Sequence, residues 1–143
     1  MIILQAYALS FLGVPYKWGG NNAVEGVDCS GLVMELLKSS AEKLPENDMN
    51  AQGLFNHYQA GNGEWNSHKI GALVFYGESV SKITHVAMLL DQYRVIEAGG
   101  GGHLVMTEAD AAAKGAVVRI RPIGYRKDLV AIIRPYFRGV GQT

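Results

Sequence analysis

Apolar residues recur at helical spacing in the first third of the chain. An amphipathic helix is predicted over residues 2–12, where the apolar positions are Ile3, Leu4, Tyr7, Ala8 and Phe11. Gly13 is suited to end it. A second helix is predicted to begin at residues 28–30, because a polar start precedes an apolar face made of Leu32, Val33, Leu36 and Leu37. A third, short helix ending near Tyr58 is predicted after Asn47 or Asp48, either of which could cap its first turn.

The second half of the chain consists of short apolar or alternating runs bounded by Gly, Asp and Pro, which are typical of strands. The runs are IGALVFYG, HVAMLLD, YRVIEAG, AVVRIRP and LVAIIRPY, beginning at residues 70, 85, 93, 116 and 129. A tight turn at Asp91 and Gln92 would join the second run to the third, and a brief helix is predicted from Thr107 to Gly115. Helices followed by strands with short connections predict the α+β class, in which N-terminal helices pack on a mainly antiparallel sheet of five to six strands.

Length and composition predict a single domain spanning residues 1–143. Thirteen basic and thirteen acidic residues cancel, so the net charge gives no reason to expect a nucleic-acid partner. A single cysteine excludes an internal disulfide and a multi-cysteine zinc site, and we expect no metal or cofactor. No stretch approaches the roughly 18 apolar residues of a membrane span, and the N-terminus lacks the basic region and cleavage site of a signal peptide. We therefore expect a protein that is made in the cytoplasm and carries no signal peptide.

The only cysteine lies in VDCSGLV, at the predicted start of the second helix. One interpretation is a small buried apolar side chain, which is the usual role of a lone cysteine. A thiol at a helix N-terminus, however, has a lowered pKa, and the thiolate is the nucleophilic form. Asp28 and Ser30 are polar neighbours that a core cysteine does not usually have, and the Cys29 amide could face the oxyanion of an attacked carbonyl. The position therefore favours a reactive thiol of low pKa.

A nucleophilic thiol needs a base, and the chain has four histidines. His57 and His68 fall in a helix and in a polar loop, where surface positions are expected, and His103 follows four glycines. His85 opens a predicted strand and is the candidate base. A two-residue hairpin turn would place Glu97 within one residue of His85, where its carboxylate could orient the imidazole. The alternative is that Glu97 is an exposed carboxylate at the end of a strand.

Four motifs occur in order between about residues 10 and 100: GVPYKWGG, VDCSGLV, GALVFY, and THVAMLL followed by VIEAGG. Together they resemble the NlpC/p-sixty superfamily of bacterial cell-wall peptidases. The resemblance implies a papain-like α+β fold and a cysteine peptidase that hydrolyses peptidoglycan stem peptides. The bond usually cut is γ-D-glutamyl–diaminopimelate, or γ-D-glutamyl–lysine in some walls.

The resemblance also implies roles for single residues. Cys29 matches the nucleophile and His85 the general base, while Glu97 stands where the family most often has His, Asn or Gln. A carboxylate can orient and stabilise an imidazolium, so Glu97 remains a candidate for the third catalytic role.

Three further positions match residues that surround the nucleophile in the family. Tyr16 matches a tyrosine whose hydroxyl lies near the tetrahedral intermediate, the alternative being a packed aromatic with a satisfied hydroxyl. Asp28 and Ser30 match substrate-binding positions that help to hold the free amine of the first alanine of the stem peptide.

The residues leave other functions open. The same constellation serves papain-like amidases and acyltransferases on other substrates, and a phage tail component could retain the fold without catalysis. A bare catalytic domain without an export signal resembles phage tail-associated members of the family, which implies phage tail or delivery-system partners and action on the cell wall. Residues 119–138 carry six basic residues against one acidic residue, so nucleic acid or anionic wall polymer could bind there. The alternation of Arg119 and Arg121 around Ile120 favours the solvent-exposed face of a strand instead.

Overall fold

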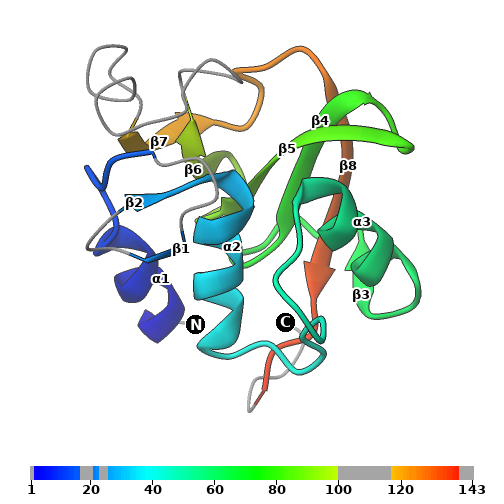
Figure 1. Ribbon diagram of the computed structural model, residues 1–143, viewed down its shortest axis with the longest axis horizontal. Helices are drawn as coiled ribbons and strands as arrows, with labels where there is room; N and C mark the ends of the chain where they lie inside the picture. Colours follow the sequence, from blue (N-terminus) through cyan, green and yellow to red (C-terminus); the bar gives the residue numbers. More distant parts are fainter. Residues whose placement is uncertain (1, 17–20, 23–25, 100–116, 139–143) are drawn as a thin grey trace.

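The computed structural model describes residues 2–16, 21–22, 26–99 and 117–138, whose arrangement is shown in Figure 1. The described helices are α1 (Ile2–Leu9), α2 (Cys29–Lys38) and α3 (Ala51–Gln59). One sheet contains β3 (Gly63–Trp65), β4 (Leu73–Ser79), β5 (Lys82–Leu89), β6 (Arg94–Gly99), β7 (Val117–Pro122) and β8 (Leu129–Pro135). A two-stranded ribbon of β1 (Asn21–Asn22) and β2 (Gly26–Val27) precedes α2. The helix expected over residues 107–115 and the histidine at position 103 lie outside the described residues.

The sheet has the strand order β3-β8-β4-β5-β6-β7, and every neighbouring pair is antiparallel. Strands β4 to β7 follow one another as a meander, and the chain then returns so that β8 pairs with the other side of β4. In Figure 1, α2 and α3 lie over one face of this sheet, and α1 lies beside α2. The predicted α+β class, with helices on one side of an antiparallel sheet, is confirmed.

Apolar side chains cover both faces of the sheet. On the helical side, Leu32, Leu36 and Leu37 of α2 are fully buried together with Phe75 and Met88, as their spacing predicts. Because side chains alternate along a strand, the neighbouring residues form a second cluster on the opposite face. That cluster contains Ala72, Val74, Tyr76, Ala87, Leu89, Val95 and Ile132, and it packs against Ile123 and Tyr125 from the connection between β7 and β8. This connection is therefore held against the strands.

The helix boundaries follow the capping residues. Helix α2 begins as predicted, because the Asp28 side chain accepts a hydrogen bond from the Gly31 amide at 2.7 Å. The predicted cap of α3 at Asn47 or Asp48 was wrong: Asn50 caps this helix and accepts from the Gly53 amide at 2.8 Å. Asp48 instead forms an ion pair with the α2 residue Lys38 at 3.3 Å.

Helix α1 is shorter than expected. It ends at Leu9, and turns lead the chain to Gly13, which adopts a positive φ of 84° and donates its amide to the Val118 carbonyl at 2.9 Å. This bond ties the end of the α1 segment to β7. None of the helices in the described residues is long and apolar enough to cross a membrane.

The hairpin between β5 and β6 differs from the prediction by one residue. Its connection is longer than a two-residue turn, since the Leu90 amide bonds the Arg94 carbonyl and Asp91 accepts from the amides of Tyr93 and Arg94. The resulting register pairs Met88 with Ile96 and Leu89 with Val95.

Continued along the strands, this register places Glu97 two residues away from His85 rather than one. The correction matters, because a shift of one residue moves a side chain to the other face of a sheet. The observed register puts the side chains of His85 and Glu97 on the same face. The predicted register would have separated them.

Candidate active site

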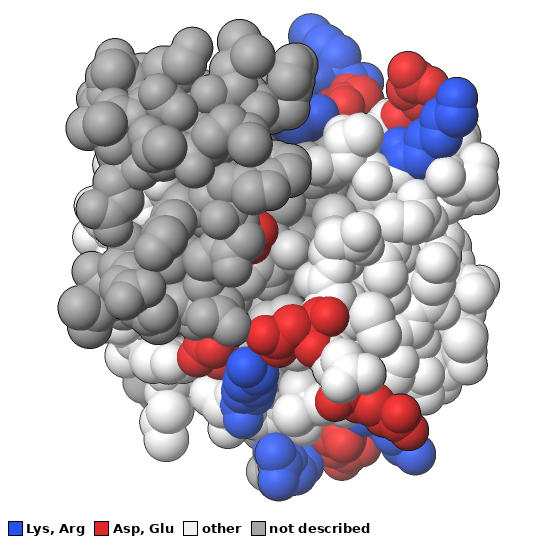
Figure 2. Space-filling view, viewed as in Figure 1, with Lys and Arg blue, Asp and Glu red and all other residues white. Residues whose placement is uncertain are grey.

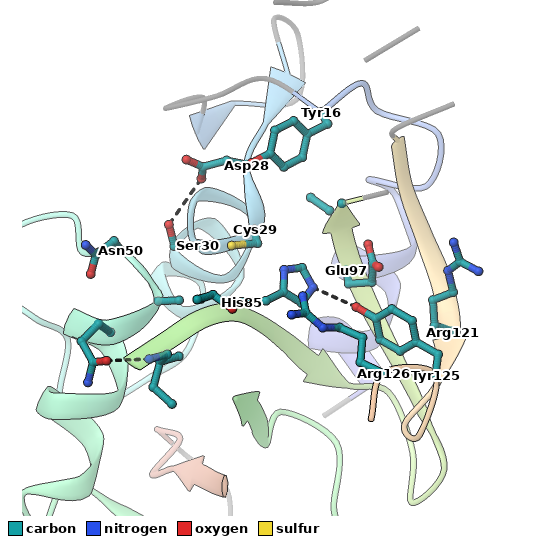
Figure 3. Close-up of a pocket in the computed structure, with 16 residues that line it drawn as sticks. Tyr16, Asp28, Cys29, Ser30, Asn50, His85, Glu97, Arg121, Tyr125 and Arg126 are labelled. Atoms are coloured by element: carbon teal, nitrogen blue, oxygen red, sulfur yellow. Dashed lines mark hydrogen bonds between the residues drawn. The ribbon is translucent and has the colours of Figure 1, made fainter. Parts of the chain in front are cut away.

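A cavity of about 800 Å³ opens at the N-terminus of α2, beside β5, β6 and β7. All six residues singled out in the sequence line it: Tyr16, Asp28, Cys29, Ser30, His85 and Glu97. They come from four separate segments of the chain, and Figure 3 shows them around one space. The fold thus brings together every candidate residue, although this proximity does not itself assign their roles.

Cys29 is the first residue of α2, and Figure 3 shows it on the side of the cavity that faces the second ring nitrogen of His85. Burial raises the pKa of this thiol to about 11, and the negative charges of Asp28 and Glu97 raise it further, while hydrogen bonds from the backbone of Val86 and Ser30 favour the thiolate. The expectation of a low pKa was therefore wrong for this structure. The helix start does supply a backbone amide, that of Ser30, which lowers the pKa of the thiol, but burial outweighs it.

His85 lies on β5 opposite Tyr76 of β4, and only 7% of its surface is exposed. Its Nε2 atom lies 2.9 Å from the hydroxyl of Tyr125. Burial lowers the pKa of the imidazole to about 3, and the positive charge of Arg126 lowers it further. At neutral pH the structure therefore holds a neutral ring beside a neutral thiol.

Glu97 lies on β6 and is 2% exposed, so it is not the exposed carboxylate that the sequence left as an alternative. Its carboxylate lies near enough to Tyr125 for its negative charge to raise the pKa of the phenol, and its Oε2 atom is buried without a hydrogen-bond partner among the described residues. Burial raises the pKa of Glu97, whereas the neighbouring Tyr125 side chain and the positive charges of Arg121 and Arg119 oppose that rise. The hydroxyl of Tyr125, and not Glu97 itself, is thus the recorded partner of the His85 ring.

Tyr16 and Asp28 lie on the other side of the thiol. Tyr16 is buried, and its pKa is raised by this burial and by the nearby negative charges of the Cys29 thiolate and of Asp28. Asp28 Oδ1 accepts from the Gly31 amide and also lies 3.4 Å from the hydroxyl of Ser30. Tyr16, Asp28 and Cys29 thus line the same cavity and lie near enough for their charges to interact.

Sequence reasoning missed Tyr125, which belongs to the connection between β7 and β8. The Ile123 amide donates to the Tyr93 carbonyl at 2.7 Å, and the Tyr76 hydroxyl donates to the Ile123 carbonyl at 2.8 Å. Arg126 makes two hydrogen bonds to Asp128, at 2.9 and 2.7 Å. These contacts anchor the connection on both sides of Tyr125. An aromatic residue isolated among glycine and charged residues was the only signal in the sequence.

The basic stretch 119–138 is only partly the solvent-exposed face that alternation favoured: Lys127 and Arg138 are exposed, whereas Arg119 and Arg121 are half-buried. Arg121 and Arg126 line the cavity, and the Nε atoms of Arg119 and Arg121 are buried. Arg134 is 2% exposed, donates to the Ile70 carbonyl at 2.9 Å and stacks over Phe137. On the described part of the face seen in Figure 2, Lys and Arg lie among Asp and Glu, in agreement with the balanced composition.

The other histidines that the structure describes lie away from the thiol. His57 is half-buried and bonds the Lys43 carbonyl at 2.6 Å, while His68 is exposed. Within the described ranges, no group of three or more His, Cys, Asp and Glu residues is arranged to hold a metal ion.

Comparison with known proteins agrees with this architecture. The NlpC/P60 family model matches residues 13–121. The bifunctional muramidase/DL-endopeptidase CwlT of Bacillus subtilis is 31% identical over 97 residues, which cover 66% of this chain and 28% of CwlT. The peptidoglycan endopeptidase RipA of Mycolicibacterium smegmatis is 33% identical over 103 residues, which cover 63% of this chain and 19% of RipA. The chain thus spans less than a third of the length of either relative.

A solved structure confirms the papain-like, NlpC-type fold. RipD of Mycobacterium tuberculosis, described as a non-catalytic NlpC/p60 domain protein adapted to peptidoglycan binding, matches with a TM-score of 0.63 and 20% identity. The match covers 92% of this chain and 94% of RipD. At this identity the likeness concerns the fold alone.

Proposed function

Since this chain belongs to the NlpC/P60 family, we propose that it is a cysteine endopeptidase that hydrolyses peptidoglycan stem peptides. The proposed bond is γ-D-glutamyl–diaminopimelate or γ-D-glutamyl–lysine, with Cys29 as nucleophile, His85 as base and Glu97 in the orienting role. One observation carries this proposal: a thiol at a capped helix N-terminus and a buried, neutral imidazole line the same cavity.

The neutral pair supports general-base attack. As the Cys29 sulfur bonds to the substrate carbonyl carbon, His85 takes the thiol proton and the carbonyl oxygen becomes an oxyanion. The backbone amide of Cys29 and the Tyr16 hydroxyl are the proposed donors to that oxyanion. When the C–N bond breaks, His85 returns the proton to the leaving amine. Water then attacks the thioester, with His85 accepting the water proton and giving it back to the sulfur.

Asp28 and Ser30 are proposed to bind the free amine at the N-terminus of the stem peptide. Both line the cavity on the thiol side, and a carboxylate is the natural partner of an ammonium group. This contact would place the γ-D-glutamyl carbonyl over Cys29. The alternative of an exposed, purely structural cap is less well supported, because Asp28 also faces the cavity.

A non-catalytic binding module is the second candidate, since RipD shows that this fold can serve peptidoglycan binding without catalysis. The presence of Cys29, His85 and Glu97 around one cavity favours catalysis instead. A papain-like amidase or acyltransferase acting on another substrate would use the same residues, so only the substrate distinguishes it.

Incubation with defined muropeptides, followed by mass spectrometry of the products, tests the proposal. We expect new fragments ending in D-glutamate, and no such fragments with Cys29→Ser. Wild-type protein that binds muropeptides but leaves them intact would support the binding module and overturn the peptidase. Muropeptides with an acetylated first alanine should be cut more slowly. Equal cleavage of intact peptidoglycan would refute the amine requirement and favour the phage-tail role.

A further inference from the structure

The hydroxyl of Tyr125 lies between His85 and Glu97 in the cavity. It lies 2.9 Å from His85 Nε2, and the nearby Glu97 carboxylate has a buried Oε2 atom without a hydrogen-bond partner among the described residues. The His85 ring and the Glu97 carboxylate both approach Gly99. A Cβ atom placed on Gly99 would lie 3.2 Å from His85 Cε1 and 3.1 Å from Glu97 Oε2. The three side chains come from β5, β6 and the connection after β7, so the fold must assemble this chain of contacts.

The direction of the Tyr125–His85 hydrogen bond follows from the charge beside it. A phenol has one proton to donate, and the negative, unpartnered Glu97 carboxylate favours the orientation in which the Tyr125 O–H points toward it. The phenol oxygen then accepts from His85, which requires a proton on His85 Nε2. A neutral imidazole carries one ring proton, so its Nδ1 atom is left with a free lone pair. In Figure 3 this second ring nitrogen lies on the side of Cys29.

We propose that Tyr125 is a positioning residue that links His85 to Glu97 and holds the imidazole in the tautomer whose unprotonated Nδ1 faces the Cys29 thiol. The catalytic role of this tautomer, to accept the thiol proton, rests on the proposed function. The tautomer itself is a property of the free protein and does not depend on any substrate. In this proposal Glu97 acts on the His85 ring through the Tyr125 phenol. The family pattern would instead have the residue at this position bonded directly to the ring.

The surroundings keep Tyr125 in the donor state. Burial raises the pKa of its phenol, and the negative charge of Glu97 raises it further, so the hydroxyl stays protonated. The Arg121 guanidinium lies 5.5 Å from the centre of the Tyr125 ring and stabilises its position as a cation–π contact. The anchoring bonds of Ile123 and the Arg126–Asp128 pair fix the backbone on both sides.

The tautomer can be read from the ring nitrogen chemical shifts of protein labelled with ¹⁵N-histidine, in long-range ¹H–¹⁵N NMR spectra at pH 7. His85→Gln assigns the signals. We expect a protonated Nε2 and an unprotonated Nδ1 in the wild-type protein. Tyr125→Phe, which removes only the hydroxyl, should shift the ring toward a mixture of tautomers. Tyr93→Phe is the matched control, because that side chain is 72% exposed, and it should leave the spectrum unchanged.

Kinetics give the second readout. With muropeptide as substrate, Tyr125→Phe should lower kcat about 10- to 100-fold with little change in KM. The reason is that fewer His85 rings then have the unprotonated Nδ1 that accepts the thiol proton. A wild-type ring protonated on Nδ1 would overturn the inference without any variant being needed. So would a Tyr125→Phe protein with wild-type ring shifts and kcat. The predicted tautomer in a protein that cuts no muropeptide would instead refute the proposed function and leave this inference standing.

Discussion

Gly99 ends β6 at the point where His85 and Glu97 approach each other. A Cβ atom at this position would lie 3.1 Å from Glu97 Oε2 and 3.2 Å from His85 Cε1, whereas ordinary van der Waals contacts begin at 3.4 Å. The backbone here does not adopt a positive φ, so alanine can take the same conformation. The substitution Gly99→Ala therefore acts on the site through contact alone.

The size of the effect follows from the displacement that these contacts require. The neighbouring atoms must move by a few tenths of an ångström. A misplacement of about 1 Å can cost about 100-fold in rate, so on a logarithmic scale a third of that distance costs about fivefold, or about 0.9 kcal/mol. Stability should not fall, because replacing glycine by alanine within a strand reduces the entropy lost on folding.

The assay compares kcat on a defined muropeptide with the midpoint of thermal unfolding, Tm. We expect Gly99→Ala to lose about fivefold in kcat with an unchanged or higher Tm. Gly124→Ala is the matched control: it lies in the connection that carries Tyr125, a Cβ there would contact nothing within 4 Å, and its kcat should stay at the wild-type value. A wild-type kcat for Gly99→Ala would show that the spacing of His85 and Glu97 does not govern the reaction. An equal loss in both variants would also refute the reasoning.

Three further predictions follow from other contacts. Alkylation of Cys29 by iodoacetamide should accelerate about tenfold per pH unit from pH 6 to 9, because the thiol, with a pKa of about 11, stays largely protonated throughout; a plateau below pH 8 would contradict this. Asp28→Asn keeps an oxygen that can cap Gly31 but removes a negative charge that raises the Cys29 pKa, so alkylation at pH 8 should be faster at unchanged stability, and slower alkylation would refute the stated cause. Asn50→Ala should lower the free energy of unfolding by about 1 kcal/mol through loss of the α3 cap, measured by urea denaturation. Asn47→Ala is the control, and an equal loss of stability in that variant would show that Asn50 is not the residue that caps α3.

The elements could be predicted because their signals are local. Periodic apolar residues predicted the α2 face and the strands, and Asp28 marked the start of α2 because few other residues accept a hydrogen bond from a helix amide so well. The cap of α3 could not be chosen in the same way. Asn47, Asp48 and Asn50 are all competent caps, and their local sequence does not distinguish them; in the structure Asn50 caps the helix and Asp48 pairs with Lys38.

The sequence predicted most residues of the candidate site but not the hydrogen bonds among them. Cys29 begins α2 as predicted. The prediction that His85 opens its strand was wrong, because β5 begins at Lys82, but His85 and Glu97 still lie on the two neighbouring strands that the sequence marks, so their convergence was foreseeable. The hydrogen bond between Tyr125 and His85 joins residues 40 positions apart, and it exists only because β8 returns to pair with β4 and draws the preceding connection across the sheet. No local pattern encodes that contact. The prediction of a low pKa for the Cys29 thiol was wrong for a related reason, because the burial that raises this pKa comes from the whole fold.

The charge of Asp28 joins substrate selection to activation of the nucleophile. In the free structure this carboxylate is one of the groups that raise the pKa of Cys29, after burial, so it opposes formation of the thiolate. If Asp28 binds the ammonium group of a stem peptide, as proposed, the positive charge cancels this opposition at the moment when the scissile carbonyl reaches the sulfur. A peptide with a capped amine would then be cleaved more slowly for two reasons: its scissile carbonyl is positioned less well, and the Cys29 thiol is less acidic. The amine requirement should accordingly appear in kcat as well as in KM, and Asp28→Asn should weaken the dependence of both on the free amine.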